Sequence, residues 1–325
     1  MESVNKNIFF EITQNFDFVP FTQSEGWWTM NSIKDENRFV FFVDSLEKPA
    51  IACMGNTMKR FGLKLLIIES ECLLDEKNID SKKIRDFYKA IVQTNFDMIE
   101  INSSLPYNAL YEIGIRQAGF LKPAGLFSTP LSILLDLQKQ IEYDKNWQKN
   151  LRRTEKYNLD FREITNPTQQ DLIDYLEIHS AMVERKKLGE KLSLEMLKKL
   201  LENENFQLFF VEDEAKKRIA GLIIYVRKDF AISIYSATSL EGREKSASYF
   251  LYDNTFRQLS KKSIVRYDCG RISPAAHTKN DIFLFKDGVK GSYLLYCGEW
   301  SWYKRQIYRP LMYFVKKYLF KRVEV

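Results

Sequence analysis

The sequence predicts a mixed α/β protein built from two tandem domains, and three observations support this class. The chain has 325 residues, which at about 150 residues per domain is enough for two domains. Hydrophobic residues make up 45% of it, so each half can form a core. Short β-branched and aromatic runs alternate with segments of helical periodicity, once before and once after residue 145. Such alternation is typical of sheets covered by helices.

In the first half, apolar runs of four to six residues predict strands, and longer segments with apolar residues three and four apart predict helices. The expected strands are residues 39–43, 65–68, 98–102 and 133–137. The expected helices are residues 81–95 and 106–116, the second opened by Pro106 and ended by Gly119.

The second half repeats this organisation. Helices are expected at residues 146–157, 171–183, 193–201 and 246–260, the third capped by Ser193. Strands are expected at residues 206–211, 219–226, 231–235, 265–268 and 282–286. We therefore expect one domain at residues 1–145, a second at 146–304, and residues 305–325 packing back on the first.

Charge and cysteine content narrow the class further. The chain has 49 Lys and Arg, 43 Asp and Glu and a net charge of +6. Seven of the basic residues and one of the acidic residues lie in residues 300–325. Residues 1–299 therefore contain 42 basic and 42 acidic residues, and the whole net charge of +6 comes from residues 300–325. Four widely spaced cysteines and two histidines predict neither disulfides nor a metal site. With no signal peptide or 18-residue apolar run, a cytoplasmic protein is expected.

Several large enzyme classes lose their usual support because their motifs are absent. The sequence contains no G-x-x-x-x-G-K-[ST], no G-x-G-x-x-G after a strand, no G-x-S-x-G and no H-E-x-x-H. Chemistry in this chain must therefore rest on isolated side chains.

Five motifs, in order along the chain, resemble those of one known family. They are Thr22-Gln23-Ser24-Glu25-Gly26-Trp27, the basic segment 150–157, Met182-Val183-Glu184-Arg185, Tyr235-Ser236-Ala237, and Tyr267-Asp268-Cys269-Gly270 followed by Ile282-Phe283-Leu284-Phe285-Lys286. Together they resemble the Fem-type (FemABX) peptidoglycan-branching aminoacyltransferases, which have two GNAT-like domains. The resemblance covers nearly the whole chain.

The resemblance implies transfer of an aminoacyl group from aminoacyl-tRNA to an amine of a UDP- or lipid-linked cell-wall precursor, with no metal and no cofactor. It places the catalytic pair on Phe285 and Lys286, and substrate contacts on Tyr235, Lys191, Arg185 and Asp268. Two departures concern the acceptor. Residues 28–31 lack the family's acceptor-binding Lys, and Met196 stands where the family has a second Tyr.

The residues suit this chemistry. Aminolysis of an activated ester needs a positioned amine and positive charge where the oxyanion develops. Lys286, at the end of an expected apolar strand, supplies that charge at a sheet edge, unless it is an ordinary surface lysine. Arg152, Arg153 and Lys156 could contact tRNA phosphates while Trp147 stacks on a base; a solvated charged helix is an equal alternative.

The cationic tail permits two interpretations that are compatible with each other. A helix from Pro310 places Leu311, Phe314, Val315, Tyr318 and Leu319 on one face, with Lys316 and Lys317 off it. Preceding aromatic residues and the positive charge favour an anionic membrane surface through residues 300–325, at the inner face of the membrane. Packing of the helix on the first domain is the alternative.

Two other function classes remain open from sequence. One is a CoA-dependent GNAT-type N-acyltransferase acting on a polysaccharide or sugar-nucleotide amine, with acetyl-CoA or another acyl-CoA as donor. Such an enzyme is expected to bind the CoA pyrophosphate with a glycine-rich turn before a helix. The nearest candidate for this turn, residues 240–247, contains one glycine, which weakens this alternative. The other is a non-catalytic RNA- or membrane-binding module.

Overall fold

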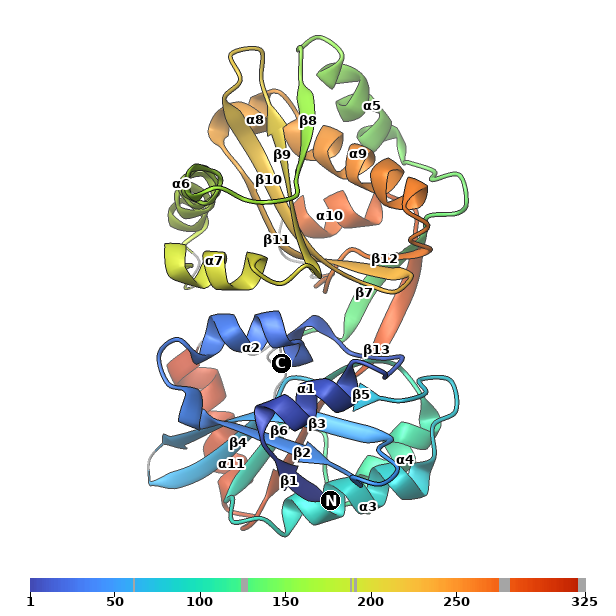
Figure 1. The fold of residues 1–325 in the computed structure, drawn as a ribbon, viewed down its shortest axis with the longest axis vertical. Helices are drawn as coiled ribbons and strands as arrows, with labels where there is room; N and C mark the ends of the chain where they lie inside the picture. Colours follow the sequence, from blue (N-terminus) through green and yellow to red (C-terminus); the bar gives the residue numbers. More distant parts are fainter. Residues whose placement is uncertain (61, 124–127, 188, 190–191, 275–280, 321–325) are drawn as a thin grey trace. The chain divides into compact units, whose positions relative to one another are not determined.

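The computed structural model describes residues 1–60, 62–123, 128–187, 189, 192–274 and 281–320, with the backbone alone at residues 319 and 320. The chain divides into two compact units (Figure 1). The first comprises Met1–Leu131 and Leu294–Val325, and the second is Ser132–Tyr293.

These boundaries differ from those expected at residues 145 and 304, because two strands join a different sheet from the one their position suggests. β7 (Leu131–Asp136) pairs with β12 (Arg266–Asp268) of the second unit. β13 (Ser292–Tyr303) pairs with β6 (Met98–Pro106) of the first unit. Sequence periodicity identifies a strand but not its partner.

The sheet of the first unit has the order β1-β2-β3-β4-β6-β13, with β5 beside β3. The remaining strands are β1 (Glu2–Val4), β2 (Phe39–Val43), β3 (Ile51–Arg60), β4 (Leu63–Ile68) and β5 (Cys72–Leu73). The β4–β6 pair is parallel, from Leu65 opposite Met98 to Ile68 opposite Ile101. β2 and β5 both pair with β3 in the antiparallel sense.

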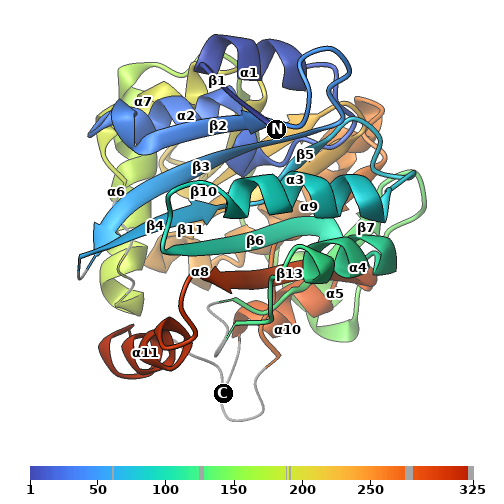
Figure 2. The same cartoon turned by 90° about the horizontal axis from the view of Figure 1, so that it is seen from below.

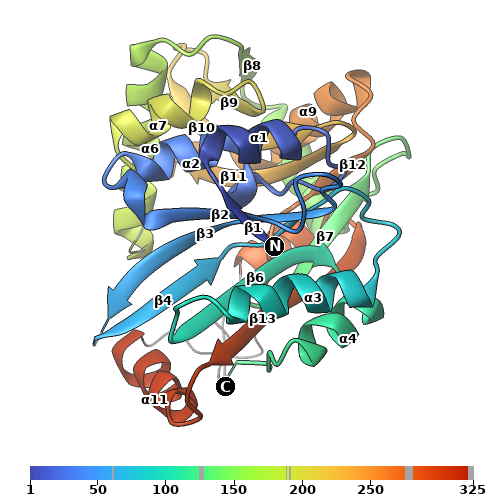
Figure 3. The ribbon, with the colours of Figure 1, turned by 60° about the horizontal axis from the view of Figure 1, so that its bottom comes forward.

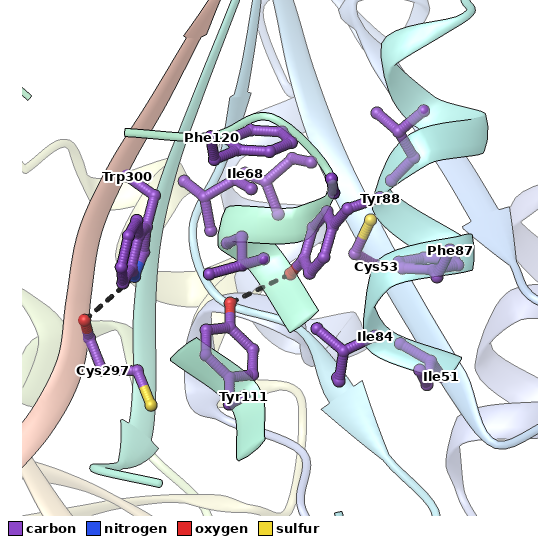
Figure 4. Packing of buried hydrophobic residues seen from close by; sticks show 14 of the residues in the cluster. Ile51, Cys53, Ile68, Ile84, Phe87, Tyr88, Tyr111, Phe120, Cys297 and Trp300 are labelled. Carbon is purple, nitrogen blue, oxygen red and sulfur yellow. Dashed lines mark hydrogen bonds between the residues drawn. The ribbon is translucent and has the colours of Figure 1, made fainter. Parts of the chain in front are cut away.

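Helices cover both faces of this sheet (Figures 2 and 3). They are α1 (Lys6–Thr13), α2 (Glu25–Ser32), α3 (Ser81–Val92), α4 (Ala109–Gln117) and α11 (Tyr308–Phe314), with short 3₁₀ turns at Phe21–Gln23 and Glu36–Arg38. Successive β2 residues face opposite sides. Phe42 packs in the core beneath α3 and α4, while Phe41 and Val43 pack with Phe9 of α1. Figure 4 shows the first of these cores.

The C-terminal segment packs on the first unit, but through a different face from the expected one. Met312 and Val315 pack with Leu65 and Met98. Lys316, expected off the packed face, is buried and lies 3.0 Å from Glu100 in an ion pair. Leu311, Phe314 and Tyr318 are exposed. Because α11 continues into a π-helical turn, Val315–Phe320, the α-helical spacing used for the prediction does not hold there.

The sheet of the second unit has the order β7-β12-β11-β10-β9-β8. Its other strands are β8 (Asp160–Ile164), β9 (Phe206–Glu212), β10 (Arg218–Arg227) and β11 (Phe230–Thr238). The β11–β12 pair is parallel, from Phe230 opposite Arg266 to Ile232 opposite Asp268. The register of β10 against β11 shifts between Ile223 and Ile224, which leaves Ile234 as a bulge.

Helices α6 and α7 lie on one face of this sheet and α5 and α9 on the other (Figure 1). The helices are α5 (Lys145–Thr154), α6 (Gln169–Lys186), α7 (Leu194–Leu201), α8 (Leu240–Glu244), α9 (Ala247–Lys261) and α10 (Asp281–Asp287). Ser193 caps α7 as expected, its hydroxyl accepting from the Met196 amide.

Most expected elements are present, and one prediction that bears on the site is wrong. Residues 282–286 form helix α10, not a strand. A run of four apolar residues has no readable period, and here Ile282 and Leu284 are exposed while the Phe285 ring packs inward. None of the helices in the described part of the chain is both long and apolar enough to cross a bilayer.

Candidate active site

Lys286 lies in the last turn of α10, and two backbone carbonyls hold its ammonium group. Its Nζ donates to the Gly270 oxygen at 3.1 Å and to the Arg271 oxygen at 3.0 Å. Burial lowers the pKa of Lys286, while nearby Cys269 and Asp268 act in the opposite direction. An ammonium has three N–H donors, so the two carbonyls leave one donor available from a positively charged group in a poorly solvated position.

A buried carboxylate fixes the loop that supplies these carbonyls. Asp268 Oδ1 accepts from the Ser132 hydroxyl and, at 2.7 Å, from the Gly270 amide. Gly270 has a φ of +77°, and a Cβ at this position would lie 3.3 Å from Lys286 Nζ. Glycine is therefore needed both for the left-handed backbone and for the close approach of the amine.

The neighbouring Phe285 lies in a cluster of aromatic rings. Its ring centroid is 5.0 Å from those of Trp147 and Tyr249 and 5.2 Å from that of Tyr252. Its carbonyl accepts from Trp147 Nε1 at 2.6 Å. At Gly288, an added Cβ would lie 2.3 Å from the Trp147 ring, so the end of α10 is seated directly on this indole. Phe285 thus positions the helix that carries Lys286.

Trp147 is wholly buried, which rules out the expected stacking of this side chain on a nucleotide base. The sequence placed it correctly on a basic helix, but its N-cap Asp144 and its bond to Phe285 turn the indole into the core.

The edge of β11 beyond its parallel partner forms one wall of the candidate site. Residues 232–236 of this strand are half-buried, and the Ser233 carbonyl would be 3.4 Å from a Cβ on Gly270. The Ser233 hydroxyl lies 2.6 Å from the Tyr267 hydroxyl and donates to Tyr252 Oη at 3.4 Å. The Ser233 hydroxyl therefore joins β11 to β12 and α9 through buried tyrosine hydroxyls, beside the loop that holds Lys286.

Tyr235 lies on the same half-buried stretch, with its ring centroid 6.1 Å from that of His179. The structure brings Lys286, Phe285 and Asp268 together, whereas the Tyr235 ring lies against α6, on the face of the sheet opposite α5 and α9. His179 itself is buried in α6.

Arg185 lies farther along, at the carboxyl end of β11. Its Nη2 donates to the Thr238 carbonyl at 3.4 Å, and its Nε is buried with no hydrogen-bond partner among the residues that the structure describes. Burial, with a contribution from the charges of Arg185 and Arg243, lowers the pKa of the adjacent Lys186. Several cations thus gather near this strand end. Lys191, the other basic residue predicted to bind substrate, lies outside the described residues.

The predicted tRNA-contacting cations lie on and just after α5. Arg152 and Arg153, in the last turn of the helix, and Lys156 beyond it are exposed to solvent. None of these three residues makes any of the contacts described above for Lys286, Phe285 or Asp268.

Sequence reasoning missed the residues that position the predicted ones. Ser132 and the aromatic residues of α9 carry no signal of their own, although Tyr249, Tyr252 and Phe256 recur at helical spacing. Gly270 belongs to the Tyr267–Gly270 motif, but its contact with Lys286 becomes visible only in the structure. Among the described residues, no three or more His, Cys, Asp or Glu side chains lie close enough together to bind a metal ion.

Comparison with known proteins identifies the fold through structure alone. The sequence matches no protein-family model and no curated protein. A solved structure named FemX is similar with a TM-score of 0.75 at 10% identity, over 96% of this chain and all of that one.

Two further solved structures support the same assignment. L-PGS from Bacillus licheniformis gives a TM-score of 0.60 at 11% identity, over 94% of this chain and 99% of that one. The C-terminal domain of an Agrobacterium fabrum protein, provisionally named a lysylphosphatidylglycerol synthetase, gives 0.58 at 13% identity, over 83% and 85%. The predicted fold, two mixed α/β units arranged along the chain as in FemX, is confirmed.

Proposed function

We propose that this protein is an acyltransferase that moves an aminoacyl group from aminoacyl-tRNA to an amine of a cell-envelope precursor, without a metal or a cofactor. The observation that carries the proposal is the Lys286 ammonium. It is half-buried, fixed by the Gly270 and Arg271 carbonyls, and, among the residues that the structure describes, left with one N–H to donate. The similarity to FemX supports the same reaction class.

The reaction itself needs little from the protein beyond position and charge. The neutral acceptor amine attacks the ester carbonyl, a C–N bond forms, and the carbonyl oxygen becomes an oxyanion. The third N–H of Lys286 stabilises this oxyanion, and since the other two are already bonded, little reorganisation is required. The intermediate then expels the ribose oxygen, which takes the proton lost by the amine.

The same geometry suggests where the substrates bind. Ser233 of β11 lies beside the loop that holds Lys286, Tyr235 lies two residues farther along the same strand, and Arg185 offers positive charge at the carboxyl end of this strand. We propose that the phosphates of a UDP- or lipid-linked peptidoglycan precursor bind there, with Lys191 contributing, and that Arg152, Arg153 and Lys156 contact the tRNA. Exposed cations follow nucleic-acid phosphates without sequence preference.

Substitution of Lys286 by Met tests the proposal, because it keeps the packing of the stem and removes the donor. Transfer from aminoacyl-tRNA to a UDP-linked muropeptide should fall about 100- to 1,000-fold, the usual effect of losing one oxyanion donor. Lys290→Met, at an exposed lysine four residues later, should transfer normally. Thermal unfolding of both variants checks that they fold.

The donor is tested in the same assay with acetyl-CoA in place of aminoacyl-tRNA. Transfer from acetyl-CoA that also depends on Lys286 would identify a CoA-dependent N-acyltransferase and overturn the proposed donor. If Lys286→Met and Lys290→Met transferred equally well, the mechanism itself would be wrong.

A further inference from the structure

The C-terminal helix presents an exposed apolar stripe on the side opposite its packed face. Leu311 and Phe314 lie three residues apart in α11 and so share one side of the helix. Ile307 is the N-cap residue of α11, and Tyr318 lies in the π-helical turn that follows it. The exposed fractions of Ile307, Leu311, Phe314 and Tyr318 are 66%, 44%, 56% and 60%. The rings of Phe314 and Tyr318 stack with centroids 5.9 Å apart, so the stripe is a continuous surface, not a set of isolated side chains.

The helix is held in place from its other side. Met312 and Val315 pack against Leu65 and Met98, and the Lys316–Glu100 ion pair is almost fully buried on the lysine side. The first unit therefore fixes the orientation of the stripe, and the exposed side chains are not needed for packing.

The exposed charged side chains that the C-terminal segment itself places beside the stripe are positive. Lys304, Arg305 and Lys317 are exposed beside it, and Lys317 Nζ lies 5.6 Å from the Tyr318 ring centroid. The only acidic residue of the sequence beyond residue 300 is Glu324. The whole net charge of the protein is concentrated in this segment, so its partner must be anionic as well as apolar.

Helix α4 of the same unit provides an internal contrast. Its Leu110 and Ile113 are exposed by 47% and 45%, similar to Leu311. There, however, Arg116 is paired with Glu112 at 2.8 Å, which balances the charge. Of these two exposed apolar patches in the described part of the unit, the C-terminal one has unpaired positive charge beside it, whereas the charge on α4 is paired.

We propose that the stripe of Ile307, Leu311, Phe314 and Tyr318 binds the surface of a membrane that contains anionic lipids. The apolar and aromatic side chains enter the boundary between headgroups and acyl chains, and Lys304, Arg305 and Lys317 contact lipid phosphates. Aromatic rings and lysine stems suit this depth because each has an apolar body and a polar end. The aromatic residues expected from sequence to serve here do not all do so, since Trp300 and Tyr303 are buried. This inference stands whether or not the proposed reaction is correct.

Vesicle sedimentation of the full-length protein tests it. The protein should bind phosphatidylcholine vesicles that contain phosphatidylglycerol, and bind pure phosphatidylcholine vesicles more weakly. Replacing Leu311 and Phe314 by Ser should weaken binding at least tenfold, since it removes the insertion of two apolar side chains. Replacing Lys304 and Arg305 by Gln should weaken binding about fivefold per charge. This loss should be seen at low salt and should disappear at high salt, where the lipid charges are screened.

Matched variants on the same unit serve as controls. Leu110→Ser with Ile113→Ser removes a comparable exposed apolar pair from α4, and Lys82→Gln with Lys83→Gln removes two exposed cations from α3. Both should bind as the unaltered protein does, and all variants should keep their unfolding temperature.

Three results would overturn the inference. They are absence of binding to the anionic vesicles, equal binding to both lipid compositions, and equal losses in the α4 control. If ultracentrifugation instead showed a dimer that Phe314→Ser converts to a monomer, with no vesicle binding, a second copy of the chain would be the partner of this face.

Discussion

Each unit contains one parallel pair of neighbouring strands, and the two units use the position just beyond that pair in opposite ways. In the first unit β6 runs on past Ile101 after β4 has ended. In the second unit β11 runs on past Ile232 after β12 has ended. In both units one edge of the longer strand therefore has no strand paired with it beyond this point, and side chains occupy the space beside it. We call this space the gap.

In the first unit the gap is closed by a completely satisfied polar network. Glu71, fully buried, accepts from the hydroxyls of Ser103 at 2.6 Å, Tyr88 at 2.8 Å and Tyr111 at 3.1 Å. The two tyrosine hydroxyls lie 3.2 Å apart, facing each other between α3 and α4 (Figure 4). Nearby, the Gln23 amide bonds the backbone of Met54 in both directions, at the end of the β3–β4 ladder.

In the second unit the corresponding place is half-exposed and one donor remains available. A buried acid is present there too, because Asp268 ends β12 and bonds Ser132 and Gly270. The hydrogen bonds of Asp268 fix the loop whose carbonyls hold Lys286 beside the gap, so the gap is not filled by a closed hydrogen-bond network. A satisfied buried network rigidifies a core, whereas one with an unused donor can act on a ligand. We therefore expect substitutions in the first network to affect stability and those in the second to affect transfer.

The largest effect on stability is expected from Glu71→Ala. It leaves the hydroxyls of Tyr88, Tyr111 and Ser103 without their shared acceptor, which should lower the free energy of unfolding by about 2–4 kcal/mol. Urea denaturation measures it, with Glu69→Ala, at an exposed position two residues away, as the control. Transfer by the folded fraction should be unchanged. If transfer were lost while stability was kept, the assignment of the two networks would be reversed.

Gly270→Ala should reduce transfer about 10- to 100-fold, because the new Cβ would lie 3.3 Å from Lys286 Nζ and press the amine out of its place against the two carbonyls. Gly62 offers a close control. It has the same φ of +77°, but a Cβ there would meet nothing within 4 Å. Both variants should lose about 1 kcal/mol or more of stability through backbone strain, so only the difference in transfer reports on the lysine. Equal transfer by the two variants would show that the position of Lys286 does not matter.

The sequence could identify these units but not their contrast. Sequence patterns located β2, β9, β10 and α9 to within a few residues, since the three strands are short apolar runs that are largely buried and α9 has buried residues at helical spacing. The motif order also placed Phe285, Lys286 and Asp268 in one site. The two acid networks, however, depend on which strands are neighbours. Glu71 and Ser103 are 32 residues apart, Asp268 and Ser132 are 136 apart, and no local pattern links them.

The same limit explains the two errors with functional consequences. In the sequence, Trp147 looks like an exposed residue of a basic helix. Its burial depends on the hydrogen bond from its Nε1 to the Phe285 carbonyl, 138 residues away. Lys316 reads as a solvated lysine until Glu100 of β6 is placed opposite it. Both outcomes are decided by a single tertiary contact.

The pH dependence of transfer should reveal the environment of Lys286. Since burial lowers its pKa from the ordinary value of 10.5, the ammonium is lost, and kcat/KM falls, at a lower pH than for an exposed lysine. Asp268 opposes this shift, so Asp268→Asn should move the fall to still lower pH. Asp287→Asn, in the same helix but bonded to Tyr293 at its exposed side, should leave it in place. A fall that Asp268→Asn moved to higher pH would contradict the electrostatic role of Asp268.

The smallest expected effect concerns the pH dependence of stability, and it separates the two acids. Burial raises the pKa of Glu71 from 4.5 in spite of its three hydrogen bonds. The folded state therefore holds this proton more tightly than the unfolded state does, so stability falls as pH rises from about 4.5 to the raised pKa, and changes no further above it. A single group contributes at most about 1.4 kcal/mol per pH unit in that window. Glu71→Gln cannot titrate, so its unfolding free energy relative to the unaltered protein should improve steadily as pH rises through this range, as measured by urea denaturation at each pH. A difference that stays constant with pH would mean that Glu71 does not hold its proton in the folded protein, and the sealed network of the first unit would then be a charged one.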